Sequence, residues 1–306
     1  MSTYELLSRE RTLTNPTADR VKDVAALARS RQRSKRGLFL VEGPQAVREA
    51  LAAHAEHPLL DALYVTEAAL ERHPDLAEGI GEAAGSRAPG EGRRVFARLV
   101  SEEVLVAMSD ALTPQGVLAV AHAGSLLRPD PWAEQPAPRL IAAMVRVQDP
   151  GNAGTLIRAA DAAGADAVVA SSGSVDVLGP KTVRSTAGSL FHLPVSAGLH
   201  LKECARQARE AGLQILAADG YGDHDLDDLA DAAARAEGPA PSDGVDLRRP
   251  TLWLFGNEAR GLTGAEKSLA DARVAVPVYG RAESLNVGTA ATVCLYASAR
   301  AQRGGR

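Results

Sequence analysis

Two spacings of hydrophobic residues alternate along the chain, one typical of amphipathic helices and the other of short buried strands. In the first third, a helical pattern at residues 19–29 precedes an apolar strand pattern at 38–41. A second helical pattern follows at 44–53 and has a proline in its first turn, which is common at helix starts. Strand patterns at 60–66 and 116–122 complete this stretch. The alternation predicts a small α/β domain.

The second half of the chain repeats this alternation over a longer stretch. We expect strands at residues 140–147, 167–170, 213–217, 252–255 and 274–278, and helices at 153–163, 202–211 and 285–302. Because apolar strand patterns alternate with helices, the sequence predicts a mostly parallel sheet with helices on both faces.

A proline-rich segment separates the two halves. Residues 126–138 contain four prolines, whose fixed φ and missing amide proton disfavour regular structure. We therefore predict a flexible basic tail at 1–18, a first domain at 19–125, a linker at 126–138 and a second domain at 139–306.

Composition narrows the functional classes. The chain has 306 residues, twice the usual domain size of about 150, so two domains are expected. Hydrophobic residues at 45% and charged residues at 24% exclude a mainly disordered, collagen-like or disulfide-scaffold chain. Aromatic residues at 4% argue against a stacking platform for single-stranded nucleic acid.

Cysteine, histidine and apolar-run patterns favour a cytoplasmic protein without a metal centre. Cys204 and Cys294 are too few and too far apart for a disulfide framework or a four-thiolate zinc site. The seven histidines form no metal-ligand set. The N-terminus carries charges where a signal peptide has its apolar stretch, and the longest uncharged runs are shorter than the roughly 20 apolar residues that span a bilayer. We expect neither secretion nor membrane insertion.

Charge is distributed unevenly around the net value of −4. Residues 1–40 contain nine basic and four acidic side chains, a net charge of +5, whereas the rest of the chain carries −9. A cationic arm on an acidic body favours a polyanionic partner. The alternative is a solvated helix end whose charges only keep the protein soluble. The basic residues that we expect to contact this polyanionic partner are Arg29, Arg31, Arg33, Lys35 and Arg36.

Two segments combine an apolar strand pattern with a glycine turn and polar residues. Residues 149–158 (DPGNAGTLIR) form a turn that exposes backbone amides to an anion or a cofactor, but they match neither a P-loop nor the dinucleotide fingerprint. Residues 252–261 (LWLFGNEARG) are an apolar strand that ends in Gly256 and Glu258. The carboxyl end of a parallel strand is where a ligand crevice is expected.

A third segment lies near the C-terminus. Residues 276–286 (VPVYGRAESLN) lead into a helix with small residues at Gly288, Ala291 and Ser298. Small residues at this spacing permit close approach of another helix or another subunit.

In this order, the three segments resemble the three motifs of the SpoU/TrmH family of RNA ribose 2′-O-methyltransferases, in the SPOUT superfamily. The resemblance covers residues 140–302 and includes 180–194 (PKTVRSTAGSLFHLP). A looser resemblance links the basic start and residues 37–43 (GLFLVEG) to the family's N-terminal substrate-binding domain. The resemblance of the three segments to this family implies an α/β fold with a C-terminal trefoil-knotted sheet, a homodimer formed through the C-terminal domain, and S-adenosylmethionine as cofactor.

The resemblance also implies roles for individual residues. The catalytic positions of the family fall on Asn152, Arg158, Glu258, Ser284 and Asn286, and its cofactor contacts fall on Gly256, Val276, Pro277 and Leu285. All of these catalytic positions keep the family's residue types, which favours an active enzyme.

Each catalytic candidate has a plain structural alternative. Asn152 and Ser284 could be N-caps of the helices that follow them. Arg158 could pair with Asp161, three residues further on. Glu258 could cap the turn after its strand, and Gly256 and Gly288 could be turn and packing glycines.

The resemblance implies methyl transfer to a ribose 2′-hydroxyl, with rRNA as the expected substrate and tRNA as an alternative. The family's arginine is proposed as the base, but a guanidinium is almost entirely protonated at pH 7. We therefore expect Arg158 to hold a phosphate and stabilise the developing alkoxide. Two other classes compete: an RNA-binding or ribosome assembly factor without turnover, and an oxidoreductase, which the missing Gly-x-Gly-x-x-Gly disfavours.

Overall fold

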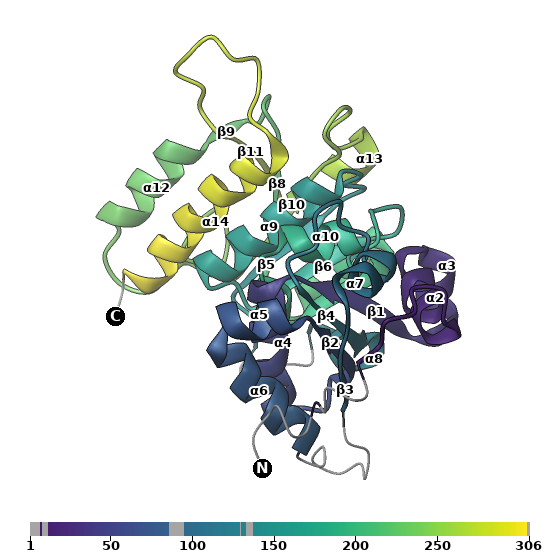
Figure 1. Ribbon diagram of the computed structural model, residues 1–306. Coiled ribbons are helices and arrows are strands. Elements are labelled where there is room, and N and C mark those ends of the chain that lie inside the picture. Colours follow the sequence, from purple (N-terminus) through teal and green to yellow (C-terminus); the bar gives the residue numbers. More distant parts are fainter. Residues whose placement is uncertain (1–6, 8–11, 86–94, 129, 133–136, 305–306) are drawn as a thin grey trace. The chain divides into compact units, whose positions relative to one another are not determined.

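A computed structural model describes residues 7, 12–85, 95–128, 130–132 and 137–304 (Figure 1). The described chain folds into two compact units. The first unit contains the chain up to Leu127 and the segment 176–192, and the second contains 128–175 and the chain from Leu193 onward. The predicted tail at 1–18 lies largely outside the described residues, as does part of the predicted linker.

The first unit is built on a four-stranded sheet with the order β1-β4-β2-β3. Its strands are β1 (Leu38–Glu42), β2 (Leu60–Val65), β3 (Phe96–Leu99) and β4 (Val117–His122). Only the β2–β3 pair is parallel. Its helices are α2 (Asp19–Ala25), η2 (Ala26–Ala28), α3 (Ser30–Arg36), α4 (Pro44–Glu56), α5 (Glu67–Arg72), α6 (Pro74–Gly85), α7 (Glu102–Met108), α8 (Ala123–Leu126), α10 (Pro180–Ser185) and η3 (Ser189–Phe191).

The second unit is built on a seven-stranded sheet with the order β7-β6-β5-β10-β8-β11-β9. Its strands are β5 (Leu140–Met144), β6 (Ala167–Ser171), β7 (Val195–Leu199), β8 (Gln214–Ala218), β9 (His224–Asp225), β10 (Thr251–Phe255) and β11 (Ala272–Ala275). Its helices are α9 (Pro150–Ala163), α11 (Leu201–Glu210), α12 (Leu226–Arg235), α13 (Gly264–Lys267) and α14 (Val287–Arg303). Every described pair of neighbouring strands is parallel, which confirms the predicted mostly parallel α/β sheet.

Strand β10 shows how both faces of this sheet are covered. Leu252 and Leu254 pack in a core cluster with Cys204 of α11. Between them, Trp253 points to the opposite face because successive side chains of a strand alternate. Its indole Nε1 donates to Ser298 Oγ of α14 (2.9 Å). All five residues of β10 are buried, as a central strand between two helical layers requires.

The elements that were not predicted from the sequence include β3, β7, α10 and α12. The clearest addition is α12. Asp225 caps this helix by accepting from Asp227 N (2.8 Å), and Leu226 is its buried residue. Asp227 and Asp228 lie in the first turn of this helix, where negative charge is favourable.

Segment 176–192 lies within the sequence range predicted for the second domain, yet it packs with the first unit. Arg33 of α3 forms an ion pair with Asp176 at the start of the segment, and Arg184 of α10 forms an ion pair with Glu42 of β1. The chain leaves the second unit after β6, completes the first unit, and returns before β7.

Candidate active site at the carboxyl rim of the parallel sheet

The loops after β5 and β10 lie at a reversal of strand order. From β5 the chain continues to β6 and then β7, toward one edge, whereas β10 lies on the other side of β5 and leads to β11, toward the opposite edge. Ligands of open parallel sheets bind at such a switch point, beyond the carboxyl ends of the strands. Residues 149–158 come at the end of the first loop and form the start of α9, and residues 256–261 lie in the second loop, so the fold brings the first two motifs to one place.

A chain of side-chain hydrogen bonds joins all three motifs. Asn152 Nδ2 donates to Glu258 Oε1 (3.2 Å), and Asn286 Nδ2 donates to Asn152 Oδ1 (2.8 Å). Asn152 belongs to the first motif, Glu258 to the second and Asn286 to the third. Asn152 therefore connects segments more than one hundred residues apart in sequence.

Glu258 holds the backbone of the first motif in addition to the Asn152 side chain. Its carboxylate accepts from Gln148 N (3.2 Å) and Asp149 N (3.0 Å), and Asn257 Nδ2 donates to its Oε2 (3.3 Å). Partial burial raises the pKa of Glu258, but hydrogen bonds from its own amide, from the two loop amides and from Asn152 outweigh burial and lower it. Glu258 is therefore a carboxylate that fixes the relative position of two loops.

The capping alternatives for Asn152 and Ser284 are wrong. Asp149 is the N-cap of α9, and its Oδ1 accepts from Asn152 N (2.8 Å). Asn286 is the N-cap of α14, and its Oδ1 accepts from Gly288 N (2.9 Å). Asn286 thus caps the helix with its oxygen and binds Asn152 with its amide nitrogen.

Arg158 and Ser284 are not part of this hydrogen-bond network. Arg158 lies exposed on α9, six residues after Asn152, and forms no hydrogen bond or ion pair with another described residue. Ser284 is exposed in the loop before α14. The guanidinium of Arg158 therefore has donors available for an anion.

Gly256 and Gly288 are required by close contacts within the chain. A Cβ on Gly256 would lie 2.5 Å from the carbonyl carbon of Gly261 and 2.6 Å from Leu262 N, where the 256–262 loop closes on itself. A Cβ on Gly288 would lie 2.7 Å from Thr155 Cγ2 of α9. The small residues of α14 therefore allow close packing against α9 within one chain.

The segment that follows β11 leaves its backbone open. Residues 276–285 form no backbone–backbone hydrogen bond to any described residue. Val276, Pro277 and Leu285 are nevertheless half-buried. Residues 278–284 are exposed, so the backbone donors and acceptors of the segment are accessible to a ligand with hydrogen-bonding edges and an apolar surface, such as a nucleoside.

A second connection between the first two motif loops was not predicted from the sequence. The Arg146 guanidinium donates from Nε and Nη2 to the two oxygens of Glu266 (2.6 and 2.7 Å), and Asn257 Nδ2 donates to Arg146 O (3.0 Å). Arg146 has φ +57°, an unusual value for a residue with a side chain. Hydrogen bonding to Arg146, opposed by burial, lowers the pKa of Glu266 to about 2. The pair is 120 residues apart, so no local spacing could reveal it.

The basic residues predicted to bind RNA divide into two groups. The prediction that Arg33 contacts RNA was wrong. Arg33 is 7% exposed and pairs with Asp176 (2.5 Å), and its Nη1 donates to Leu27 O and Ala28 O (both 2.8 Å). This burial makes it part of the fold and removes it from the exposed set. The exposed residues are Arg29, Arg31, Lys35 and Arg36, of which Arg36 pairs with Asp23 (2.8 Å).

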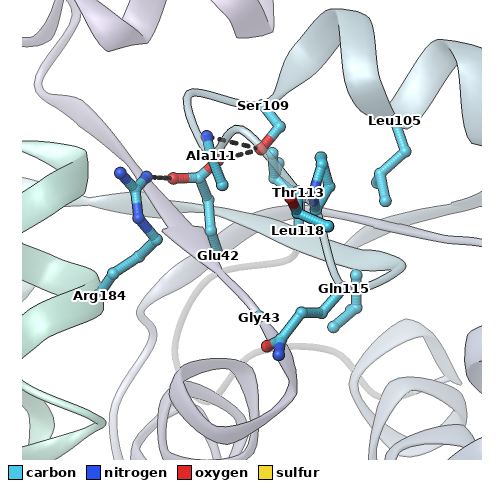
Figure 2. A pocket seen from close by; sticks show the side chains of 11 residues that line it. Glu42, Gly43, Leu105, Ser109, Ala111, Thr113, Gln115, Leu118 and Arg184 are labelled. Atoms are coloured by element: carbon cyan, nitrogen blue, oxygen red, sulfur yellow. Dashed lines mark hydrogen bonds and ion pairs between the residues drawn. The ribbon is translucent and has the colours of Figure 1, made fainter.

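A small cavity of about 80 Å³ lies in the first unit, and Glu42 is one of the residues that line it (Figure 2). The Glu42 carboxylate binds the Arg184 guanidinium and the Ser109 hydroxyl, and it accepts from Asp110 N (2.8 Å). Figure 2 shows Arg184 and Ser109 reaching this carboxylate from different elements. The carboxylate thereby connects β1 to α10 and to the loop after α7.

The described residues contain neither a candidate metal-binding cluster nor a candidate membrane-spanning helix. No cluster of three or more histidine, cysteine or acidic side chains could hold a metal ion within the described chain. None of the described helices is long and apolar enough to cross a membrane. Cys204 and Cys294 are free and buried, and burial raises the pKa of the Cys204 thiol to about 11.

Comparison with known proteins agrees with this geometry. Residues 139–296 match the family model described as SpoU rRNA Methylase family, and residues 18–119 match the model described as MRM3-like substrate binding domain. The chain belongs to the SpoU rRNA methylase family. All three motif segments joined by the Asn152 hydrogen bonds lie within the first match.

Relatives of this SpoU family member match it over different shares of its length. A Bacillus subtilis protein named 23S rRNA (guanosine(2553)-2'-O)-methyltransferase RlmP is 31% identical, and the match covers 90% of this chain and 94% of that protein. A Streptomyces viridochromogenes protein named 23S rRNA (uridine(2479)-2'-O)-methyltransferase is 38% identical over 53% of this chain and 52% of its own length.

Solved structures of SpoU-type proteins share the fold. The S. viridochromogenes SpoU methyltransferase AviRb in complex with the cofactor AdoMet has a TM-score of 0.73 and 28% identity, covering 94% of this chain and 100% of that one. An AdoMet-bound rRNA methyltransferase from Sinorhizobium meliloti has a TM-score of 0.73 and 27% identity, covering 95% and 97%.

Proposed function

We propose that this chain transfers a methyl group from S-adenosylmethionine to a ribose 2′-hydroxyl of ribosomal RNA. The observation that carries the proposal is the bonding of Asn152 to both Glu258 and Asn286, which unites the three motif loops in one site. Membership of the SpoU family and the AdoMet complexes of its structural relatives support the choice of cofactor and reaction.

The cofactor has a suitable place in this unit. The open backbone of 276–285, with Val276, Pro277 and Leu285, would bind the nucleoside part of S-adenosylmethionine, and the tight loop that Gly256 permits would form the adjoining wall. When bound, the cofactor supplies a methyl group on a positively charged sulfur, which needs no metal for activation.

The chain's own residues position the acceptor. Arg158 would bind the phosphate next to the target ribose and stabilise negative charge on the 2′-oxygen as its proton leaves to water. Asn152, held on both sides, would keep the start of α9 in place, and Ser284 would contact the substrate from the loop before α14. Alignment of the two reactants would supply most of the rate enhancement.

The first unit would select the RNA. The match to a substrate-binding domain and the exposed residues Arg29, Arg31, Lys35 and Arg36 support RNA binding there. Relatives are named for guanosine and for uridine, so the modified nucleoside differs within the family. We place the reaction in the cytoplasm, with residues 126–138 as the linker between the RNA-binding and methyltransferase domains.

We also propose a homodimer formed through the C-terminal domain and a trefoil knot within it. Val293 and Tyr296 on α14 are 38% and 49% exposed, and apolar side chains on a helix surface favour a second copy as their partner. Light scattering at micromolar concentration would give twice 31.9 kDa. A monomer at all concentrations would contradict the dimer.

The function is tested by incubating the full chain with labelled S-adenosylmethionine and in vitro transcripts of 23S rRNA, 16S rRNA and tRNA. We expect label in the 23S transcript at a linkage that resists alkaline hydrolysis. Label in tRNA alone would favour the tRNA alternative. RNA binding without methyl transfer and without cofactor affinity by calorimetry would favour a non-catalytic assembly factor.

A further inference from the structure

Two arginines share one aromatic ring in the first unit, away from the residues already described. The Arg20 guanidinium carbon lies 3.5 Å from the centroid of the Phe96 ring, and the Arg98 guanidinium carbon lies 4.7 Å from it. Phe96 and Arg98 belong to β3, which is an edge strand, and Arg20 belongs to α2. Arg20 Nε also donates to the Tyr64 hydroxyl (2.8 Å). These contacts hold both guanidiniums in place.

Neither guanidinium has a carboxylate partner in the described part of the chain. The acidic residues of α2 are engaged elsewhere, Asp19 with Lys22 (3.8 Å) and Asp23 with Arg36 (2.8 Å). Other arginines of the unit do form ion pairs: Arg33, Arg36, Arg48 and Arg184. Two positive charges at one ring repel each other, so an anion between or beside them would be stabilised.

Both guanidiniums keep donors available. Arg20 uses only Nε, and Arg98 uses only Nη1, which donates to Ala97 O (3.1 Å), in hydrogen bonds to described residues. Stacking on an aromatic ring orders a guanidinium and leaves its edge free. An ordered side chain loses less conformational entropy when it binds, and free paired N–H groups suit the two oxygens of a phosphate.

We infer that Arg20 and Arg98, ordered by Phe96, bind the phosphate backbone of the RNA substrate. The inference rests on the proposed function, which makes RNA the substrate. It names a contact surface on β3 and α2, outside the exposed residues of α3 that the sequence predicted. Phosphate contacts position RNA without reading bases, so this surface would contribute affinity and register while the methyltransferase unit performs the reaction.

The test uses the full chain with the double substitution Arg20→Gln and Arg98→Gln and an in vitro 23S rRNA transcript. We expect the dependence of log affinity on log salt to become less steep by about 2, one for each phosphate contact. The KM for RNA should rise about tenfold or more at 0.1 M salt, with kcat at saturating RNA unchanged. Arg206→Gln on α11, where Arg206 pairs with Glu203 and Glu210, is the matched control and should leave both quantities unchanged.

A second variant separates charge from fold. Arg20→Lys with Arg98→Lys keeps both charges, so its salt dependence should stay close to that of the wild-type chain. The inference would be overturned if the Gln variant kept the wild-type salt dependence and melted at a lower temperature. Arg20 and Arg98 would then only pack on Phe96 and stabilise the fold. If the wild-type chain methylates the transcript and the Gln variant keeps the wild-type salt dependence, the inference about Arg20 and Arg98 fails while the proposed function stands. If the wild-type chain does not methylate the transcript, the proposed function itself fails.

Discussion

Arg33 and Arg158 were both expected to contact RNA, and the two units place them in opposite environments. In the first unit, Arg33 is buried on α3, with an acidic partner and two backbone acceptors. In the second unit, Arg158 is exposed on α9 without a described partner, beside a rim where the other motif residues bind one another. Burial and hydrogen-bonding partners, more than residue type, therefore decide whether an arginine stabilises the fold or is available to a substrate.

The largest effect is expected from removing the buried arginine. Arg33→Met leaves Leu27 O and Ala28 O without this donor and Asp176 without its partner, and should lower the free energy of unfolding by about 2–4 kcal/mol. Urea denaturation followed by circular dichroism measures this change. Arg31→Met, on the same helix but exposed, is the control and should stay within about 0.5 kcal/mol of wild type. Equal losses in the two variants would show that Arg33 is not structural.

The next effect concerns the connection between the motif loops. Glu258→Ala removes the acceptor for Gln148 N, Asp149 N and Asn152 Nδ2, and should lower kcat/KM for methyl transfer about 10- to 100-fold. Glu258→Gln keeps an acceptor oxygen and should lose less. Steady-state assays with calorimetry of cofactor binding measure this. Wild-type turnover in Glu258→Ala, with Glu203→Ala as the surface control, would refute a positioning role.

A smaller effect is expected from the Arg146–Glu266 pair. The pKa of Glu266 is about 2 in the folded chain, below its usual value, so its stabilisation is complete above pH 5 and is lost as the pH falls toward 2. Glu266→Gln should cost about 1–2 kcal/mol at neutral pH and flatten the loss of stability between pH 5 and 2. Thermal melts across this range measure it. Parallel curves for the two proteins would show that another group governs the acid range.

The smallest effect is expected from the exposed basic residues of α3. Arg31→Gln should leave the melting temperature unchanged and make the salt dependence of RNA affinity less steep by about 1. Filter binding at several salt concentrations measures the slope. An unchanged slope would assign Arg31 to the solvated helix end that the sequence also allowed.

Much of the second unit could be predicted because its signals are local. Apolar runs such as the one at 252–255 and the glycine turns after them are visible in sequence, and they specify buried parallel strands that end at a ligand rim. Contacts between side chains of different elements were harder to predict. Asn286 caps α14 and also binds Asn152, and only the folded sheet brings these two asparagines together.

The first unit was predicted less well because its pairings are long-range. Strand β3 has four residues and was missed, and with it the Phe96 ring that carries two guanidiniums. The burial of Arg33 depends on Asp176, 143 residues away. A basic run shows the number of charges in a segment but not which of them meet a carboxylate inside the fold.

Single-turnover methyl transfer to a 23S rRNA transcript by the wild-type chain and by Arg158→Ala is the decisive test of the proposed function. We expect one new ribose 2′-O-methyl group with the wild type and a rate lower by a factor on the order of 100 or more with the variant, at unchanged cofactor affinity. A wild-type rate in Arg158→Ala, or the absence of a 2′-O-methyl product with the wild-type chain, would contradict it.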